Sequence, residues 1–321
     1  MSRAVMPEFV DFLKLFGGFV YLLMGGELLV RGALGLSKES RIPPVIVGMT
    51  VVAMGTSAPE LMVSTFSALS GYPGIAIGNV VGSNIANVLL VVGVPVLIYP
   101  IVCAQEGLLK QTNLMIAVSV VFIVMCVFEP IGFLEGILLV GLLIAFLFAA
   151  TRGAALIALD DPEEEMDRGF GLPSYPGTIT LFIVLGVIAL PVGADLVVEG
   201  GVGLASSWGV SEAVIGLSLI ALGTSLPELS TTVIAALHKS SDVAIGNVVG
   251  SNLFNILAIL GITALLTDIP VDPDFIRFDL WIMLAASILL WLFVLLRGTI
   301  TRVWGVALLS GYFGYLFIIY Q

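Results

Sequence analysis

Two glutamates stand inside apolar stretches of the chain, and nearly the same sequence surrounds each of them. Residues 48–61 read GMTVVAMGTSAPEL and residues 216–229 read GLSLIALGTSLPEL, which places Glu60 and Glu228 168 positions apart. Residues 78–87, GNVVGSNIAN, recur at the same offset as GNVVGSNLFN. Carboxylate, hydroxyl and amide oxygens are the ligands that hard cations prefer. The motifs therefore point to Ca²⁺ or Na⁺ rather than to Zn²⁺ or Cu⁺.

The first motif places its polar side chains on one side of a helix. Thr56 and Ser57 precede Glu60 by four and three residues, and both spacings bring side chains to one face. Pro59 lacks an N–H group and clashes with the carbonyl four residues earlier, so we expect a kink that frees nearby carbonyls as ligands. Residues 223–228 repeat every one of these elements.

The second motif supplies further oxygens. Ser83 and Asn87 are four residues apart and share a helix face, as do Ser251 and Asn255. Paired glycines in each copy allow close helix packing. Packing alone would explain one copy, and a single glutamate could be protonated and structural. The duplication of acid, proline and hydroxyls favours a binding site.

The composition indicates that lipid surrounds most of the chain. The 321 residues are 59% hydrophobic and 11% charged, whereas soluble domains carry about 25% charged residues. Mean hydropathy is +1.15, and long apolar runs recur throughout. The first 16 residues do not resemble a cleaved secretory signal. No region is basic enough to bind nucleic acid.

Apolar runs and breaks predict an all-α integral membrane protein with ten transmembrane helices. The expected spans are 9–31, 43–70, 75–99, 111–128, 131–151, 177–199, 212–237, 243–266, 278–297 and 300–320. Five spans per copy would insert the second copy upside down, which gives two inverted five-helix repeats, as in many transporters. The expected units are repeat 1–151, an acidic linker 152–176 and repeat 177–321.

Loop charges test this layout, because positive charge marks the cytoplasmic side. One side of a ten-span chain would hold only Arg3, Lys14 and Arg277. The other side would hold the nine remaining bases: Arg31, Lys38, Arg41, Lys110, Arg152, Arg168, Lys239, Arg297 and Arg302. We therefore expect a plasma (inner) membrane protein with both termini outside and a cytoplasmic acidic loop. That loop could sense cations, although a solvated linker explains its charge run.

The motifs resemble those of the calcium/cation antiporter superfamily, specifically its Na⁺/Ca²⁺ exchanger branch with prokaryotic members. GTSxPE and GNVVGSN, each present twice, resemble that family's alpha-1 and alpha-2 repeats, and the likeness covers nearly the whole chain. The resemblance implies inverted five-helix halves with helices 2, 3, 7 and 8 as the core. It also implies an ion carrier rather than an enzyme, with no cofactor. We expect the chain to work as a monomer in the bilayer.

The same resemblance implies specific ligands. A Ca²⁺ site would centre on the carboxylates of Glu60 and Glu228. The main-chain carbonyls of Thr56 and Thr224 would complete it. Flanking Na⁺ sites would use Ser57 and Ser83 on one side and Ser225 and Ser251 on the other, with the carbonyls of Ala53 and Ala221 as further ligands. Asn87 and Asn255 would lie at the middle of the cluster.

The residue at position 255 bears on the choice of ions. In the K⁺-dependent members of the family that this chain resembles, the matching residue is an aspartate. Here Asn255 and its counterpart Asn87 are neutral amides. Two ionised glutamates give the site a charge of −2, so the three-for-one exchange familiar in this branch would move net charge. The sequence therefore predicts electrogenic, K⁺-independent exchange of Na⁺ for Ca²⁺. H⁺/Ca²⁺ exchange, a cation channel and a receptor or structural protein remain alternatives.

Three further titratable residues are less distinctive. His238, the single histidine, precedes Lys239 and is expected to be a solvated loop residue. Glu27 and Asp195 occupy matched positions on helices that resemble the family's sliding gate. They could face the access paths or could be ordinary residues of helix interfaces.

Overall fold

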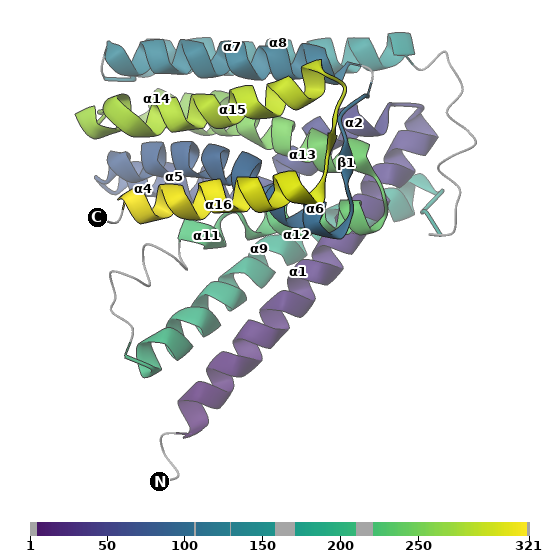
Figure 1. Ribbon diagram of the computed structural model, residues 1–321, viewed down its shortest axis with the longest axis horizontal. Coiled ribbons are helices and arrows are strands. Elements are labelled where there is room, and N and C mark those ends of the chain that lie inside the picture. The colour runs from purple at the N-terminus through teal and green to yellow at the C-terminus, as the bar shows by residue number, and fades with distance from the viewer. Residues whose placement is uncertain (1–4, 106, 129, 158–170, 210–220, 320–321) are drawn as a thin grey trace.

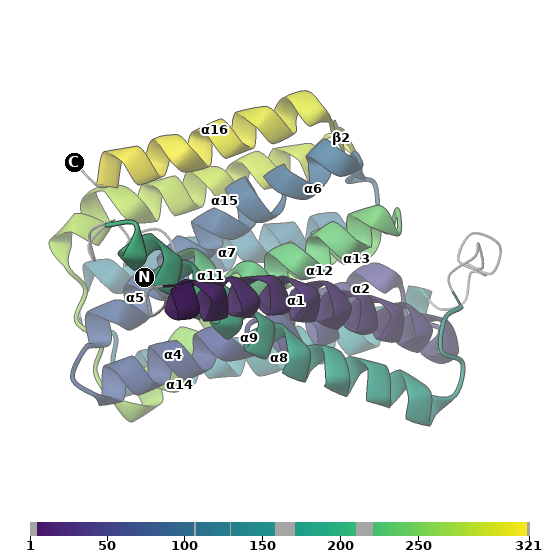
Figure 2. The ribbon, with the colours of Figure 1, turned by 90° about the horizontal axis from the view of Figure 1, so that it is seen from below.

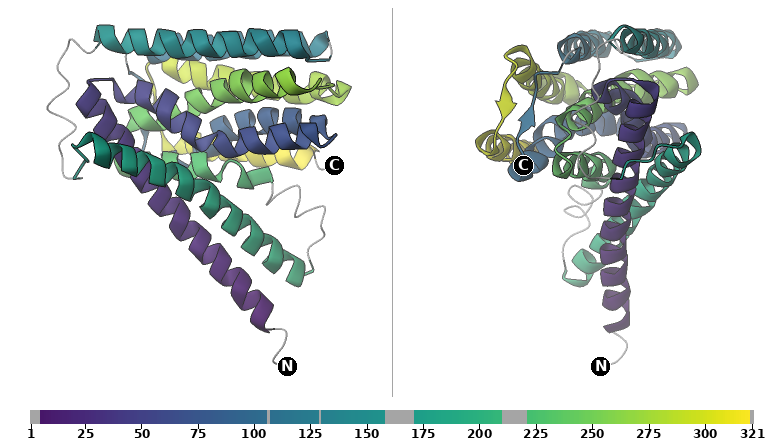
Figure 3. Two further views of the ribbon diagram at one scale, coloured as in Figure 1. Left: turned by 180° about the vertical axis from the view of Figure 1, so that it is seen from behind. Right: turned by 90° about the vertical axis from the view of Figure 1, so that its right-hand side faces the viewer.

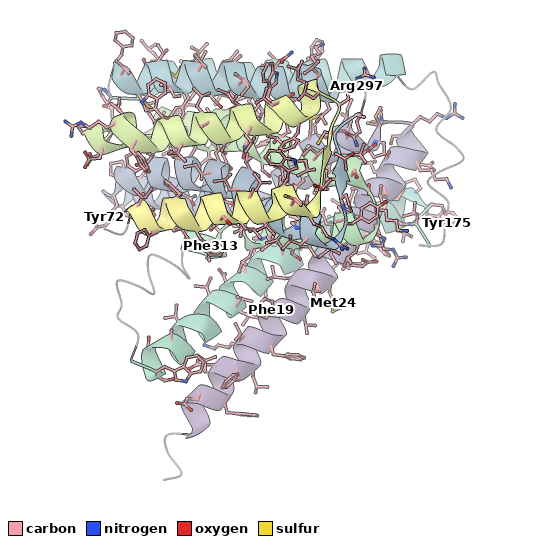
Figure 4. The ribbon with its side chains drawn as sticks, viewed as in Figure 1. Phe19, Met24, Tyr72, Tyr175, Arg297 and Phe313 are labelled. Atoms are coloured by element: carbon pink, nitrogen blue, oxygen red, sulfur yellow. The ribbon has the colours of Figure 1, made fainter. Side chains whose placement is uncertain are left out.

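The structure, a computed structural model, describes residues 5–105, 107–128, 130–157, 171–209 and 221–319. Within these residues, eight helices are long and apolar enough to cross a membrane, and a bent pair of helices would make a ninth. Large apolar side chains point outward, such as Phe19, which is 49% exposed, and Phe313, which is 59% exposed (Figure 4). Apolar surface of this extent requires a hydrocarbon solvent. The chain is a helical, multi-pass integral membrane protein.

The first half of the chain contains long helices and broken ones. Its elements are α1 (Val5–Ser40), α2 (Pro44–Val47), η1 (Gly48–Val52), α3 (Ala53–Thr56), α4 (Ala58–Leu69), α5 (Pro73–Ala86), η2 (Asn87–Val91), α6 (Gly93–Ile98), β1 (Ile101–Val102), α7 (Leu108–Val127) and α8 (Phe133–Ile157). The η segments are π-helical turns, which the sequence pattern does not predict. Such turns occur often at functional sites.

The second half repeats the order of the helices where the structure describes it, but it adds the π turn η5 before α15 and places its strand β2 before the last helix. Its elements are α9 (Pro176–Ser207), α11 (Ala221–Gly223), α12 (Leu226–Leu237), α13 (Ser241–Phe254), η4 (Asn255–Leu260), α14 (Gly261–Leu266), η5 (Phe275–Asp279), α15 (Leu280–Leu295), β2 (Thr299–Ile300) and α16 (Arg302–Ile319). The π turns η2 and η4 begin at equivalent residues, Asn87 and Asn255. The predicted span 212–237 lies partly outside the described residues, and the acidic run 160–167 lies wholly outside them.

Helices α1 and α9 form an oblique antiparallel pair that projects from the rest of the bundle (Figures 1 and 3). Glycines repeat every seven residues along each contact face: Gly18, Gly25 and Gly32 on α1, and Gly186, Gly193 and Gly200 on α9. A Cβ atom added at Gly193 would lie 2.8 Å from the Leu22 backbone nitrogen. The two backbones can approach this closely only because glycine lacks a side chain.

The predicted ends of these two helices are wrong. We expected spans 9–31 and 177–199, but α1 continues to Ser40 and α9 to Ser207. The glycine seam extends over the added turns, since Gly200 packs on the backbone of residue 11 and Gly35 on that of Pro173. Tertiary packing therefore keeps these more polar turns helical. Helix α8 likewise continues to Ile157, into the expected linker.

Helices α5 and α13 with their π turns form the centre of the molecule. Every described residue from Val243 to Leu260 is buried, and α13 packs on α2, η1 and α3 of the other half. Helix α4 packs on α5 and η4, whereas α12 packs on α13 and η2. Helix α1 lies against α12 (Figure 2). The two copies of GNVVGSN thus lie on the most buried of the candidate spans that the structure describes.

The two halves are intertwined. The last helix of each half packs on the other half, α8 against α14 and α16 against α6. Two short backbone pairings also join the halves. Strand β1 pairs antiparallel with β2 (Figure 3), and Ile131 forms a β-bridge with Ile269. The small β ribbon is an addition to the expected all-α fold. Because these contacts cross between the halves, neither half encloses a core of its own.

Candidate cation-binding site

Both glutamates stand just after a break in a helix. The helices Pro44–Thr56 and Ala58–Leu69 meet at an angle of 44° around Ser57. Ser57 (φ −85°, ψ 3°) and its counterpart Ser225 (φ −89°, ψ 1°) adopt the same non-helical conformation. This bend confirms the predicted kink. The helix restarts at Ala58, and Pro59 in its first turn has no N–H group with which to continue the preceding helix.

The breaks place each carboxylate in the first turn of a new helix, Glu60 in α4 and Glu228 in α12. The exposed fractions of the two residues are 1% and 0%. Their carboxyl groups interact electrostatically with each other. The positive end of the helix dipole stabilises an anion at this position, but two buried carboxylates repel. A cation or a proton is needed to balance them.

Hydroxyl groups from one half reach the acid and the motif of the other. The Ser57 Oγ donates a hydrogen bond of 3.1 Å to Glu228 Oε1. The Thr56 Oγ1 lies 3.5 Å from Ser251 Oγ and 3.2 Å from the Ala53 carbonyl oxygen. All five residues are buried. Residues that the sequence separates by about half the chain therefore form one polar cluster.

Asn247 holds the glutamate-bearing helix of its own half and reaches across to the other half. Its Nδ2 donates to the Glu228 carbonyl oxygen at 3.4 Å and to Thr232 Oγ1 at 3.1 Å. Its Oδ1 accepts from Thr56 Oγ1 at 3.3 Å. The residue is completely buried, so each of its polar atoms depends on these partners.

Asn79 does the same in the first half. Its Nδ2 donates to the Glu60 carbonyl oxygen at 3.3 Å and to Ser64 Oγ at 2.9 Å. Its Oδ1 accepts from Thr224 Oγ1 at 3.3 Å. The sequence prediction missed Asn79 and Asn247, although their exact duplication within GNVVGSN was available as a signal.

Four further asparagines meet where α5 crosses α13. The Asn87 Nδ2 donates to Asn252 Oδ1 at 3.1 Å, and the Asn255 Nδ2 donates to Asn84 Oδ1 at 3.1 Å. Each of the four is 1% exposed. Asn87 matches Asn255 and Asn84 matches Asn252 in the duplicated motif, so the two bonds are equivalent. A twofold relation between the halves requires this equivalence. Asn84 and Asn252 were likewise missed as contributors to the site.

Several oxygens in this region are buried and have no hydrogen-bond partner among the residues that the structure describes. Five of them belong to residues that the sequence prediction singled out: Glu60 Oε2, Glu228 Oε2, Ser225 Oγ, Asn87 Oδ1 and Asn255 Oδ1. Buried polar atoms without partners are rare and costly. Carboxylate, hydroxyl and amide oxygens are suited to Ca²⁺ or Na⁺. The residues present therefore fit a hard cation.

The two copies of the site are not in the same arrangement. Ser57 is bonded to Glu228, whereas Ser225 Oγ has no partner within the described part of the chain. The Ser57 N–H donates to the carbonyl four residues back, that of Ala53, but the Ser225 N–H donates to Leu222, three residues back. The same sequence thus adopts two slightly different states in one molecule.

The remaining predicted ligands differ in how they are engaged. Ser83 is buried. The Ala53 carbonyl already accepts hydrogen bonds from Ser57 N–H and Thr56 Oγ1. Ala221 begins α11, three residues before Thr224. The role of each of these residues as an ion ligand stays a prediction.

His238 lies in the turn after α12, as expected, but the expectation that it is solvated is wrong. Its side chain is 7% exposed, and its Nε2 lies 2.7 Å from Glu27 Oε2 on α1. Arg31 Nη1 lies 3.9 Å from the same glutamate's Oε1. The close packing of α1 on α12 buries the histidine, which a turn composition does not reveal. Glu27 is therefore part of a helix interface, whereas its counterpart Asp195 is exposed.

Comparison with known proteins agrees with this geometry. The family model described as sodium/calcium exchanger protein matches residues 11–152 and 178–321. The putative antiporter CaxA of Alkalimonas amylolytica is 36% identical over 95% of this chain and 97% of its own length. The sodium/calcium exchanger MaX1 of Methanosarcina acetivorans is 33% identical over 97% of this chain and 99% of its own.

A solved structure extends the likeness to three dimensions. A structure of the sodium–calcium exchanger NCX_Mj superimposes with a TM-score of 0.82 at 28% identity, covering 97% of this chain and 98% of that one. Sequence and fold agree over both halves, including the two motifs that carry the glutamates. The chain belongs to the sodium/calcium exchanger protein family.

Proposed function

We propose that this protein is a secondary antiporter that exchanges Na⁺ for Ca²⁺ across the membrane by alternating access. The observation that carries the proposal is the group of five buried oxygens around Glu60 and Glu228 that have no hydrogen-bond partner among the residues that the structure describes. They come from both halves of the chain, so a bound cation would join the halves. The likeness of the chain to MaX1 and NCX_Mj, which are both named as sodium/calcium exchangers, supports the same function.

The charge of the site favours Na⁺ and Ca²⁺ without K⁺. With both glutamates ionised, the cluster carries two negative charges, and Asn87 and Asn255 add none. One Ca²⁺ or two Na⁺ balance this charge, and a third Na⁺ leaves one positive charge in excess. Three-for-one exchange would therefore be electrogenic. The hydroxyls of Ser57, Ser225 and Ser251 suit Na⁺, whereas a proton would need no such cage.

The proposal includes ten spans in two inverted repeats, 1–151 and 177–321, joined by a cytoplasmic acidic segment in the inner membrane. Tyr175 and Arg297 lie at one end of the helices, and Tyr72 lies at the other (Figure 4). Basic residues predominate in the loops assigned to the first end. That end would face the cytoplasm, with both chain termini outside.

Radioactive Ca²⁺ uptake into vesicles tests the function. An outward Na⁺ gradient should drive uptake without K⁺, and an imposed pH gradient alone should not. Glu228→Gln should abolish uptake, because it removes half of the negative charge at the site while keeping the size of the side chain. Glu199→Gln, at an exposed acid that pairs with Lys14 on the side of α9, serves as the control and should retain uptake.

Each contrary result has a definite meaning. Na⁺-driven exchange that persists in Glu228→Gln would contradict the central site. Uptake that follows only the pH gradient would replace Na⁺ by H⁺ as the coupling ion. A requirement for K⁺ would contradict the assignment made from the neutral amides.

A further inference from the structure

Two chains of hydrogen bonds run through the centre of the molecule, and each ends on a methionine sulfur. In one, Asn252 Nδ2 donates to Met115 Sδ at 3.8 Å while Asn252 Oδ1 accepts from Asn87. In the other, Asn84 Nδ2 donates to Met283 Sδ at 3.6 Å while Asn84 Oδ1 accepts from Asn255. Both methionines are fully buried.

An asparagine side chain has a donating end and an accepting end of nearly equal size, so its neighbours decide which way it faces. A thioether sulfur accepts weakly and cannot donate. Met115 therefore favours the amino end of Asn252. The oxygen of Asn252 then faces Asn87 and selects the amino end of that residue in turn.

The consequence appears at the far end of each chain. Because the amino group of Asn87 is held by Asn252, its oxygen must face away from that bond, and it is buried without a partner among the described residues. The oxygen of Asn255 is in the same situation. Asn87 is the first residue of the π turn η2, on which α12 with Glu228 packs. Asn255 is the first residue of η4, on which α4 with Glu60 packs.

We propose that Asn84 and Asn252 are positioning residues that fix the amide oxygens of Asn255 and Asn87 toward the bound cation, with Met283 and Met115 as their anchors. The inference rests on the proposed cation site. Reversing one chain would place an oxygen against a sulfur and an amino group against the cation, and both changes are unfavourable. The two neutral amides thereby add oxygens of defined orientation to the site without the additional charge of an aspartate.

Ca²⁺ binding to the purified protein tests the inference separately from transport. Asn252→Leu removes the bond that orients Asn87 while keeping the branched shape and the number of heavy atoms of the side chain. We expect the dissociation constant for Ca²⁺ to rise about tenfold, the change that corresponds to about 1.4 kcal/mol. Met115→Leu, which removes only the sulfur anchor, should raise it by a smaller factor. Met62→Leu, at a residue 58% exposed on α4, is the control and should change nothing.

A rescue experiment separates orientation from mere packing. A carboxylate presents oxygen whichever way it turns, so Asn87→Asp combined with Asn252→Leu should restore Ca²⁺ affinity to within a few fold of the Asn87→Asp single variant. The equivalent pair Asn84→Leu and Asn255→Asp should behave alike. A double variant as weak as Asn252→Leu would overturn the proposal, as would wild-type affinity in both Asn252→Leu and Asn84→Leu.

The outcomes also distinguish this inference from the proposed function. A wild-type protein that binds Ca²⁺ but shows no Na⁺-driven uptake would contradict the antiporter and leave the orienting role to be decided by the rescue. If Asn252→Leu does not fold, Met115→Leu decides, because an unchanged dissociation constant in that variant would overturn the anchoring role.

Discussion

Asn79 and Asn247 show how single side chains stabilise the buried acids. Each bonds to the carbonyl of the glutamate in its own half and to a hydroxyl one turn later on the same helix. Each also accepts from a threonine of the other half. The backbone at both glutamates is therefore fixed twice, once within its half and once across the interface.

The two asparagines differ in burial, and this difference gives a prediction. Asn247→Leu removes three hydrogen bonds at a fully buried residue and leaves the former partners unsatisfied, which we expect to cost on the order of 3 kcal/mol. Asn79→Leu breaks equivalent bonds at a residue that is only partly buried, where the groups left without partners are less desolvated. Thermal unfolding of the purified variants should show the larger loss of stability for Asn247→Leu, and equal losses would contradict the argument.

At the scale of helices, glycine determines how closely α1 and α9 approach. The seam repeats every seven residues on both helices, and the nearest atoms are mostly backbone, which cannot move aside as a flexible side chain can. The pair is also connected to the glutamate helix α12, since Ser230 Oγ donates to the Leu22 carbonyl oxygen at 2.6 Å. Movement of α1 would therefore displace or break this bond, which lies two residues from Glu228 on α12.

The seam predicts that one added methyl group is enough to separate the pair. A Cβ at Gly193 would lie 2.8 Å from the Leu22 nitrogen and 2.9 Å from the Gly18 carbonyl oxygen, so Gly193→Ala should lower thermal stability and slow Ca²⁺ exchange. A Cβ added at Gly17 would have no atom of another described element within 4 Å. Gly17→Ala should leave both measurements unchanged, and similar behaviour of the two variants would refute the close contact.

At the scale of the whole molecule, the last helix of each half packs on the other half. Helix α8 packs on α14 and α16 packs on α6. The glutamate-bearing helices also contact the opposite half, α4 through η4 and α14, and α12 through η2 and α6. Equivalent turns have equivalent geometry, since Gly71 (φ 90°) and Lys239 (φ 56°) are matched positions that both adopt positive φ. If the repeats are inverted, these matched turns lie on opposite sides of the membrane.

Cysteine labelling can test this inversion. Tyr72→Cys, at a residue 66% exposed, should react with an impermeant maleimide in intact cells. Lys239→Cys, in the matched turn of the second half, should react only after the membrane is opened. The native Cys103 and Cys126 are buried and give a low background. Labelling of both variants from the same side would contradict the inverted layout.

The sequence by itself determined the membrane setting, the duplication, the kink at Pro59 and the oxygen chemistry around Glu60 and Glu228. These follow from composition, from spacing within one helix and from the missing N–H group of proline, all of which are local properties. They required no knowledge of which helices meet.

Only the tertiary structure decided which residues complete the site. Asn247 meets Thr56, Asn252 meets Asn87, and His238 meets Glu27 across separations of about 165 to 211 residues. Burial of His238 and extension of α1 to Ser40 also depend on contacts between helices. A spacing pattern reports one helix face at a time, whereas hydrogen bonds between halves depend on how those faces pack together.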